Sequence, residues 1–116
     1  MNQQAEQGTI STVDAANFGA EVLQGSGPIA VEFMSYSCSH CGQVELPLSQ
    51  VAESLRGRER IVRVNVVRDH ELAERYSIHG TPTLIMFLDG EMRGRVEGPV
   101  PTVEVLLDAV TRPFSH

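Results

Sequence analysis

The chain of 116 residues contains no lysine and no tryptophan, and it has only two cysteines. All nine of its cationic residues are arginine, and 15 acidic residues outnumber them, which gives a formal net charge of −6. Nucleic acids and anionic membranes both favour basic surfaces, so this balance argues against either as the main partner. Two cysteines are also too few for a small secreted domain that is held together by disulfides.

Long hydrophobic runs are missing as well. No segment approaches the roughly 18–20 apolar residues of a membrane span, so we expect no transmembrane helix. The N-terminal stretch MNQQAEQGTIST is polar and lacks the basic and then apolar layout of a signal peptide. We therefore expect a cytoplasmic protein, or a periplasmic one if a targeting segment has been removed. The whole chain, 1–116, is expected to be one monomeric domain with a flexible tail over residues 1–8.

Hydrophobic periodicity predicts alternating strands and helices. Strands are expected over residues 9–13, 29–34, 61–67, 84–88 and 91–97. Helices are expected after a cap at Asp14 or Thr12, from Cys41 to Gly57, over residues 69–76, and from residue 101 or 102 onward. Strands joined through helices should be parallel, whereas the turn signal Asp89-Gly90 predicts an antiparallel hairpin. The predicted fold is therefore α/β, with the order βαβαβαββα and a mixed central sheet flanked by helices.

The predicted helices carry further expectations. In the long helix the apolar residues recur at steps of four, three and four, so Pro47 should kink this helix without ending it. Asp69 is expected to cap the helix over 69–76. In the first helix one face should carry Phe18, Val22 and Leu23. In the last helix four residues should face the core: Val103, Leu106, Leu107 and Val110.

Both cysteines, Cys38 and Cys41, stand at the junction between the strand over 29–34 and the long helix. Incidental core cysteines would not be paired at such a junction. A structural zinc site needs four ligands, and no metal site is predicted because ligand-like spacing is missing among the histidines, His40, His70, His79 and His116. A Cys-x-x-Cys pair near a βαβ pattern is instead typical of a redox motif.

The spacing of the pair suits thiol–disulfide exchange, in which the attacking group is a thiolate. A free cysteine has a pKa of about 8.5 and is mostly protonated at neutral pH. If the helix begins at Cys38, its unpaired N–H groups and the positive end of its dipole stabilise the thiolate. Cys41, one turn later, can then close on Cys38 and release a bound substrate. We expect Cys38 to be the exposed nucleophile and Cys41 the more buried resolving cysteine.

Two other residues bear on the proton chemistry of the pair. A protonated His40 would stabilise the Cys38 thiolate, and a more stable reduced form makes a stronger oxidant. The alternative is that His40 is a solvent-exposed side chain without a role. Glu32 is the one charge in a buried-looking strand, where desolvation raises the pKa of a carboxyl. We hypothesise that Glu32 accepts or returns the Cys41 proton, the alternative being a solvated glutamate at the edge of the sheet.

Together these residues resemble thioredoxin and its relatives. From Phe18 to Gly98 the landmarks fall in register without a gap: Phe18, Gly27, Val31-Glu32-Phe33, Cys38-x-x-Cys41, Tyr76, Gly80-Thr81-Pro82-Thr83, Asp89-Gly90 and Gly98. The resemblance implies a thioredoxin fold, with Cys38 as nucleophile and Cys41 as resolving cysteine. It implies no cofactor beyond a redox-active Cys38–Cys41 disulfide.

The resemblance also implies a substrate-binding surface. Pro82 is expected to be cis and to face the cysteines, the backbone of Thr81 to pair with an extended substrate peptide, and Gly98 to flank the substrate groove. Tyr36 and Ser37, which precede the pair, are expected to belong to this surface. The expected partners are proteins that carry disulfides or dithiols, together with an upstream reductase or other redox partner.

Several positions depart from ordinary thioredoxins. Their usual Trp-Cys-Gly-Pro-Cys is replaced by Ser37-Cys38-Ser39-His40-Cys41, which is more similar to the oxidising, periplasmic disulfide-forming relatives. Ser39 and His40 are therefore expected to tune the pair. Glu32 lies where thioredoxins carry a buried aspartate, and Arg63 replaces the lysine partner of that acid. Because arginine does not lose its proton, Arg63 should keep Glu32 more ionised than a lysine would.

The sequence thus predicts a thiol–disulfide oxidoreductase that acts on protein substrates and is less reducing than an ordinary thioredoxin. Its direction is left open between reduction, oxidation and isomerisation. Two further functions stay open beside it. One is an extracytoplasmic disulfide oxidase or isomerase, and the other is a chaperone or binding module that has the fold and barely uses its thiols.

Overall fold

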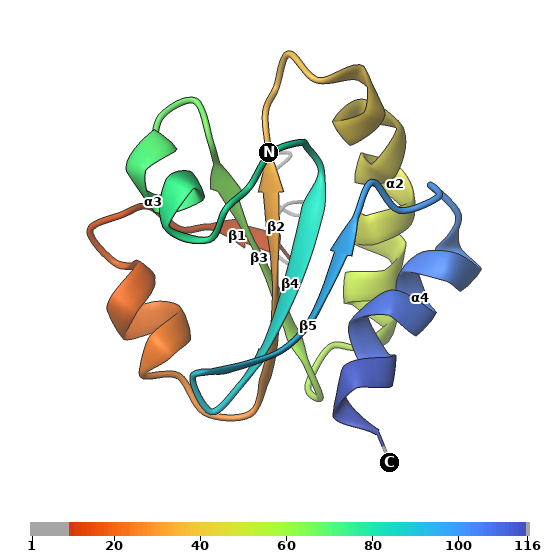
Figure 1. Ribbon diagram of the computed structural model, residues 1–116. Coiled ribbons are helices and arrows are strands. Elements are labelled where there is room, and N and C mark those ends of the chain that lie inside the picture. Colours follow the sequence, from red (N-terminus) through yellow and green to blue (C-terminus); the bar gives the residue numbers. More distant parts are fainter. Residues whose placement is uncertain (1–9, 116) are drawn as a thin grey trace, which may run out of the picture.

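The computed structural model describes residues 10–115, which form a five-stranded sheet with helices on both faces (Figure 1). The strands are β1 (Ile10–Thr12), β2 (Pro28–Met34), β3 (Arg60–Asn65), β4 (Thr83–Leu88) and β5 (Glu91–Glu97). The helices are η1 (Gly19–Leu23), α2 (Ser39–Ser54), α3 (His70–Arg75), α4 (Val103–Thr111) and η2 (Arg112–Phe114). The predicted α/β order is confirmed, while the tail predicted for residues 1–8 lies outside the described residues.

The sheet has the order β1-β3-β2-β4-β5 and is mixed, as predicted. β1, β3 and β2 are parallel, because their connections cross over through helical segments, and β4 and β5 are antiparallel to their neighbours. Asp89 and Gly90 both have positive φ, 50° and 86°, which is the backbone of the tight hairpin turn that the sequence indicated. β2 lies at the centre and places Glu32 opposite Arg63 on one side and Leu84 on the other.

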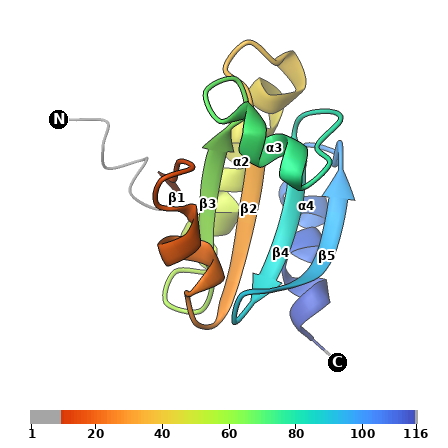
Figure 2. The ribbon, with the colours of Figure 1, turned by 60° about the vertical axis from the view of Figure 1, so that its left-hand side comes forward.

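The helices form two layers around the sheet. α2 and α4 cover one face, and η1 and α3 lie on the other (Figure 2). The buried cluster under α2 and α4 includes Ala30, Val44, Leu48, Leu84 and Leu106. The cluster on the opposite face includes Phe18, Val31, Phe33, Leu72 and Phe87. Because successive strand residues point to opposite faces, Glu32 shares the α2 face with Ala30.

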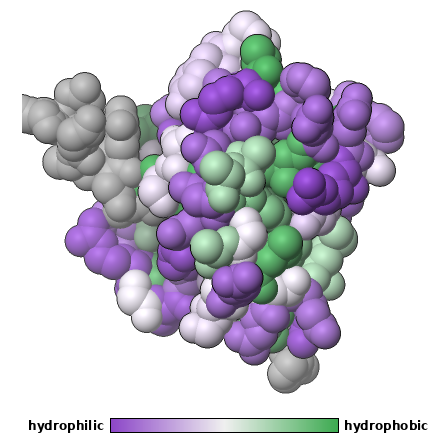
Figure 3. Space-filling view, turned by 90° about the vertical axis from the view of Figure 1, so that its left-hand side faces the viewer, coloured by the Kyte–Doolittle hydropathy of each residue, from purple (hydrophilic) through white to green (hydrophobic). Residues whose placement is uncertain are grey.

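Aromatic side chains concentrate on the η1 and α3 side of the sheet. The ring of Tyr76 packs against those of Phe18, Phe33 and Phe87, with centroid distances between 5.6 and 6.0 Å. Tilted and edge-on pairs of this kind stabilise a core beyond the area that they bury. Seen from this side, the surface is mostly hydrophilic and shows hydrophobic side chains near its middle (Figure 3). Among residues 10–115, no helix is long and apolar enough to span a bilayer.

The predictions about apolar positions at the end of β3 and in α4 were wrong. β3 ends at Asn65 instead of residue 67, because the Asn65 side-chain oxygen accepts a hydrogen bond from the Val67 N–H at 3.0 Å and turns the chain. Val67 is consequently 70% exposed. Likewise α4 packs against the core through a single stripe of side chains. Leu106 and Val110 are buried in this stripe, whereas Val103 and Leu107 are exposed.

The helix ends also differ in part from the predictions. Asp14 and Asn17 exchange hydrogen bonds between side chain and backbone, 2.8 and 3.0 Å long, so Asp14, not Thr12, caps the turn that leads into η1. The N-cap residue of η1 itself is Phe18, which provides no side-chain cap to this helical segment. On that segment Leu23 is exposed, unlike Phe18 and Val22. The Asp69 side chain does not cap α3, since its oxygens bind the Ala15 N–H and the Arg68 guanidinium instead.

α2 continues through Pro47, as its periodicity indicated. The residues beyond its end turn at Gly57, whose φ of 88° is easily reached only by glycine.

Candidate active site

The redox pair lies where β2 passes into α2. Cys38 is the N-cap residue of α2, and its sulfur accepts a hydrogen bond from the Cys41 N–H at 3.0 Å. The preceding turn is held by Ser35, whose carbonyl accepts from the Cys38 N–H at 3.2 Å and whose hydroxyl contacts the Ser37 hydroxyl at 3.0 Å. The Cys38 sulfur therefore lies at the positive end of a 16-residue helix, as expected from the sequence.

The two thiols occupy different environments. Cys38 is partly exposed and Cys41 is buried, which confirms the predicted difference in accessibility. Partial burial by itself would raise the pKa of Cys38. Hydrogen bonds from the Cys41 side chain and from the backbone N–H groups of Cys41 and His40 outweigh the effect of burial and lower the pKa. Burial raises the pKa of Cys41 to about 11, and its hydrogen bond with Cys38 adds to this rise. Cys38 is therefore the more readily ionised of the two thiols, and Cys41 remains a thiol at neutral pH.

Thr81 and Pro82 lie directly beside Cys38. The Thr81–Pro82 bond is cis, as the family resemblance implied. The Cys38 thiol donates a hydrogen bond to the Thr81 carbonyl at 3.4 Å, and the Pro82 carbonyl accepts from the Gly98 N–H at 2.9 Å. These bonds bring the start of β4 and the end of β5 to the sulfur. Gly98 has a φ of 58°, a conformation that favours glycine, and it is exposed.

The His40 ring points to the loop that follows β5. Its Nε2 lies 2.8 Å from the Pro99 carbonyl oxygen, so this nitrogen carries the proton that is donated. A Cβ atom placed on Gly98 would lie 3.7 Å from His40 Cε1. The ring thus joins the first turn of α2 to the loop, while Cys38 is stabilised by the backbone N–H of His40. Ser39 begins α2 and is exposed.

Glu32 and Arg63 form a buried ion pair in the sheet. They are register partners on β2 and β3, and Arg63 Nε lies 3.4 Å from Glu32 Oε1. Only 1% of Glu32 and 6% of Arg63 is exposed, so Glu32 is not a solvated edge residue. Burial raises the pKa of Glu32, and the Arg63 charge and hydrogen bond oppose this rise without cancelling it. Both side chains lie on the face covered by α2, the helix that carries Cys41.

Exposed residues surround the pair. Tyr36 is 69% exposed, and Ser37 is exposed as well. A shallow depression adjoins them, lined by Ser35, Tyr36, Ser37, Asn65 and Val67. The residues predicted to bind substrate, Tyr36, Ser37, Thr81, Pro82 and Gly98, thus fall into two groups. Thr81, Pro82 and Gly98 are joined by the hydrogen bonds above, and Tyr36 and Ser37 lie in the turn before Cys38.

Three residues of the site were missed by the sequence analysis. Pro99 receives the His40 hydrogen bond, Ser35 shapes the turn, and Glu45 on α2 lies with Oε2 3.8 Å from Arg63 Nη1. A signal for Glu45 was present, because it follows Cys41 by four residues and therefore shares its side of the helix. No comparable signal indicated the Pro99 carbonyl, since its position depends on how the loop after β5 folds.

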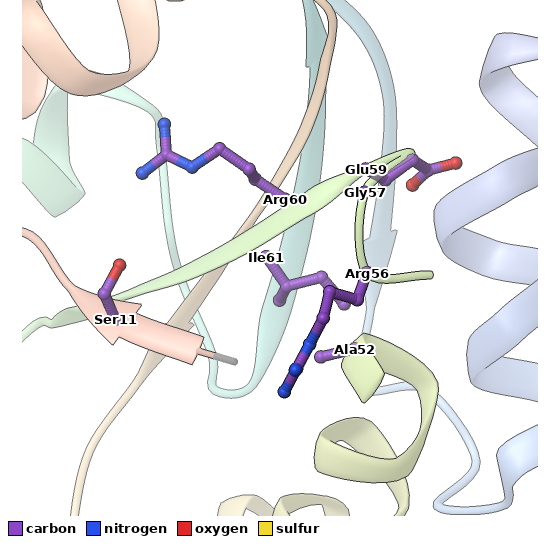
Figure 4. A pocket seen from close by; sticks show the side chains of 7 residues that line it. All are labelled: Ser11, Ala52, Arg56, Gly57, Glu59, Arg60 and Ile61. Carbon is purple, nitrogen blue, oxygen red and sulfur yellow. The ribbon is translucent and has the colours of Figure 1, made fainter. Parts of the chain in front are cut away.

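A second pocket lies at the opposite end of the sheet, where β3 begins (Figure 4). It is lined by Ser11, Ala52, Arg56, Gly57, Glu59, Arg60 and Ile61. Arg60 and Glu59, neighbours in the chain, extend to opposite sides of the strand start. Arg56 and Arg60 are each paired with an acidic residue, Glu53 at 2.8 Å and Glu21 at 3.1 Å. Among residues 10–115, no group of three or more metal-ligating side chains comes together there or elsewhere.

This fold, with a Cys-x-x-Cys pair at the start of a helix, defines a protein-disulfide oxidoreductase. The family model described as Thioredoxin matches residues 9–111. Thioredoxin C-2 of Corynebacterium nephridii is 32% identical over 93 residues, which cover 80% of this chain and 86% of that protein. Thioredoxin 1 of Synechococcus elongatus is 33% identical over 91 residues, covering 78% and 85%. The chain belongs to the thioredoxin family.

Proposed function

We propose that the protein exchanges disulfides with protein substrates through Cys38, with Cys41 as the resolving cysteine and Glu32 as its proton partner. The observation that carries this proposal is the placement of Cys38. Its partly exposed sulfur accepts the Cys41 N–H at the start of α2 and lies 3.4 Å from the Thr81 carbonyl. Cys41 is buried one turn further along the same helix. Such an arrangement supports attack from outside and resolution from inside.

In the reductive direction the Cys38 thiolate attacks one sulfur of a substrate disulfide. The substrate S–S bond breaks, a mixed disulfide forms, and one substrate sulfur leaves as a thiolate. Cys41 then transfers its proton to the Glu32 carboxylate and attacks the Cys38 sulfur. The Cys38–Cys41 disulfide forms, the second substrate thiolate leaves, and it can take up that proton. The substrate gains two electrons and two protons, of which one comes from Cys41 and the other from water. The reverse sequence oxidises a dithiol.

The acid–base properties of the three groups support these roles. The lowered pKa of Cys38 favours a thiolate before the substrate arrives, whereas Cys41, with a pKa of about 11, stays a thiol until it is needed. A thiol with so high a pKa needs a base, and burial raises the pKa of Glu32. A base with a raised pKa holds a proton more readily at neutral pH, which suits proton exchange with a thiol.

The substrate is proposed to be an extended peptide segment. It would pair with the backbone of Thr81 and pass between Gly98 on one side and Tyr36 and Ser37 on the other. The exposure of Gly98 and Tyr36 supports this path. We propose an upstream reductase as the source of electrons. We further propose that the protein is a monomeric domain in the cytoplasm, with the periplasm as the alternative compartment.

The pair is further proposed to be less reducing than that of an ordinary thioredoxin. Support comes from the lowered pKa of Cys38 and from the Ser39-His40 dipeptide, because a stabilised thiolate stabilises the reduced form. Equilibration with mixtures of reduced and oxidised glutathione measures the potential, for which about 30 mV corresponds to a tenfold change in the equilibrium constant. A potential at or below that of an ordinary thioredoxin, measured in parallel, would contradict this part of the proposal.

Trapping tests the exchange mechanism itself. Cys41→Ser should accumulate mixed disulfides between Cys38 and substrate proteins, which are stable on non-reducing gels and released by dithiothreitol. Cys38→Ser, the matched control, should trap far fewer. The binding-module alternative would be favoured if the wild type reduced insulin negligibly while a Cys38→Ser, Cys41→Ser double variant still bound the same partners.

A further inference from the structure

Three charged side chains form a line from the sheet to the surface of α2. Glu32 lies at the buried end, Arg63 lies between, and Glu45 lies at the other end with 51% of its side chain exposed. Arg63 Nε is 3.4 Å from Glu32, and Arg63 Nη1 is 3.8 Å from Glu45. Because a guanidinium is planar and rigid, Arg63 can form ion pairs with Glu32 and Glu45 at the same time only from a fixed position.

We propose that Glu45 is a positioning residue, which holds Arg63 between two carboxylates and so sets the pH range in which Glu32 accepts the Cys41 proton. This inference rests on the proposed role of Glu32 and deepens it. Without Glu45, the whole guanidinium charge would act on Glu32 alone. With Glu45 in place, part of that charge is engaged at the surface, and the carboxylate of Glu45 itself acts against ionisation of Glu32.

The surroundings of Glu32 contain few other groups that could have this effect. β3 presents Arg63 on this face, and α2 presents Glu45 together with Cys41 and, at its N-cap, Cys38. β4 presents Leu84 and Met86, and α4 presents Leu106 and Val110, none of which titrates. The charges that act on the Glu32 pKa are those of Arg63, which lowers it, and of Glu45, which raises it. Removal of Glu45 must therefore lower the Glu32 pKa.

An exposed ion pair commonly contributes little to stability, which is the simplest alternative for Arg63 and Glu45. Here, however, only one partner is exposed. Arg63 and Glu32 are both buried, so solvent screens their interaction poorly, and the charge of Glu45 raises the pKa of Glu32. Glu45 thus acts on the proton affinity of Glu32 and need not contribute to folding.

Glu45→Gln and the matched control Glu53→Gln test it. Both remove one negative charge from exposed positions of α2, but Glu53 pairs with Arg56 at 2.8 Å. The first measurement is the Glu32 pKa, which is obtained from the carbon-13 NMR shift of its side-chain carboxyl as a function of pH. We expect a lower pKa in E45Q than in the wild type and no change in E53Q. An unchanged Glu32 pKa in E45Q would overturn the inference.

The second measurement is the pH profile of the resolving step. With dithionitrobenzoate as the disulfide, attack by Cys38 releases one coloured thiol and resolution by Cys41 releases the second, so stopped-flow absorbance separates the two. In E45Q the acid limb of the second phase should move to lower pH. Well below the midpoint, a limb displaced by about 0.3 on the pH scale makes the step about twofold faster. E53Q should follow the wild-type profile. A lower Glu32 pKa with an unmoved profile would also overturn the inference.

The double variant Glu32→Gln, Glu45→Gln separates this inference from the function on which it rests. If Glu32 is the proton partner, E32Q alone slows the second phase, and adding E45Q then changes nothing further. If E32Q leaves the second phase unchanged across pH 6–8, the proposed role of Glu32 has failed. If E32Q slows that phase but E45Q has no effect in the wild-type background, only the inference about Glu45 has failed.

Discussion

Glu32 and Glu59 are two carboxyl groups whose pKa is raised chiefly by burial, yet they lie in unlike surroundings. Glu32 is inside β2, faces Arg63 at 3.4 Å and lies under the helix that carries the redox pair. Glu59 precedes β3, its pKa is raised to about 7, and its buried Oε1 has no hydrogen-bond partner among residues 10–115. Arg58 acts on Glu59 only through its charge, since its guanidinium donates to the Ser54 carbonyl.

This difference shows that a raised pKa is not by itself a sign of function. Desolvation alone produces the same direction of change at both sites. Glu32 is distinguished by its neighbours. One is the nearly unexposed cation Arg63, and the other is the helix α2, which carries the Cys41 thiol with a pKa of about 11. Glu59 lacks a thiol or a peptide-binding surface nearby, so we expect its burial to matter for stability and its chemistry not to matter for exchange.

The largest effect should come from removing the cations beside the two acids. Arg63→Gln leaves Glu32 buried without its counter-charge, and loss of one partner of a buried pair costs about 3–5 kcal/mol. Because Glu32 can take up a proton, we expect the lower end, about 3 kcal/mol. Arg58→Gln, which removes the exposed cation beside Glu59, should change the free energy of unfolding by no more than about 0.5 kcal/mol. Urea denaturation at pH 7 measures both, and equal midpoints for the two variants would remove this contrast.

A smaller but more specific effect concerns the rate of exchange. Glu32→Gln keeps the size and polarity of the side chain but cannot accept a proton. Loss of a general base typically costs on the order of a hundredfold, so the resolving step should slow by about that factor at pH 7. Glu59→Gln should leave it unchanged within about twofold, because Glu59 lies at the far end of β3. Stopped-flow release of the second thiol from dithionitrobenzoate compares the two variants.

The expected difference between Glu32 and Glu59 would be contradicted if E32Q and E59Q slowed the resolving step to the same extent, or if neither variant slowed it. Equal slowing would indicate a general effect of lost charge or of altered stability. No slowing in E32Q across pH 6–8 would mean that Cys41 loses its proton directly to water or to the departing thiolate. The first phase, attack by Cys38, serves as an internal control, since Cys38 is stabilised by the start of α2 and not by Glu32.

Much of this picture could be predicted from the sequence, because it depends on local patterns. The near-continuous apolar run of β2 and the position of Cys38 after it predicted both a buried Glu32 and a thiol at a helix start. The turn at Asp89-Gly90 predicted the hairpin for the same kind of reason. Such signals depend on neighbours in the chain, which the sequence shows directly.

Contacts between distant segments could not be predicted in this way. The His40 bond to Pro99 and the 3.8 Å approach of Glu45 to Arg63 depend on how α2 sits against β3 and the loop after β5. The end of β3 was misjudged for a related reason, since the side-chain bond of Asn65 outweighed the apolar character of the next two residues. The same limit applies to Glu59, whose burial follows from packing at the start of β3 and not from any motif.

The smallest expected effect is the pH dependence of stability due to Glu59. Its pKa rises from 4.5 to about 7 on folding, so the unfolded chain loses this proton first as the pH increases. The free energy of unfolding should therefore fall between about pH 4.5 and pH 7 and then level off. Glu59→Gln should lack this part of the fall and be more stable than the wild type above pH 7.

Partial exposure of Glu59 screens the effect, so the fall in the free energy of unfolding should be smaller than the full change in pKa would give. Urea denaturation at half-unit pH intervals measures it, with the exposed Glu53→Gln as the control. If the curves of wild type and E59Q ran parallel from pH 4.5 to pH 7, burial of Glu59 would have no consequence for folding. Glu32 should add a fall in the same direction to both curves, because burial raises its pKa as well.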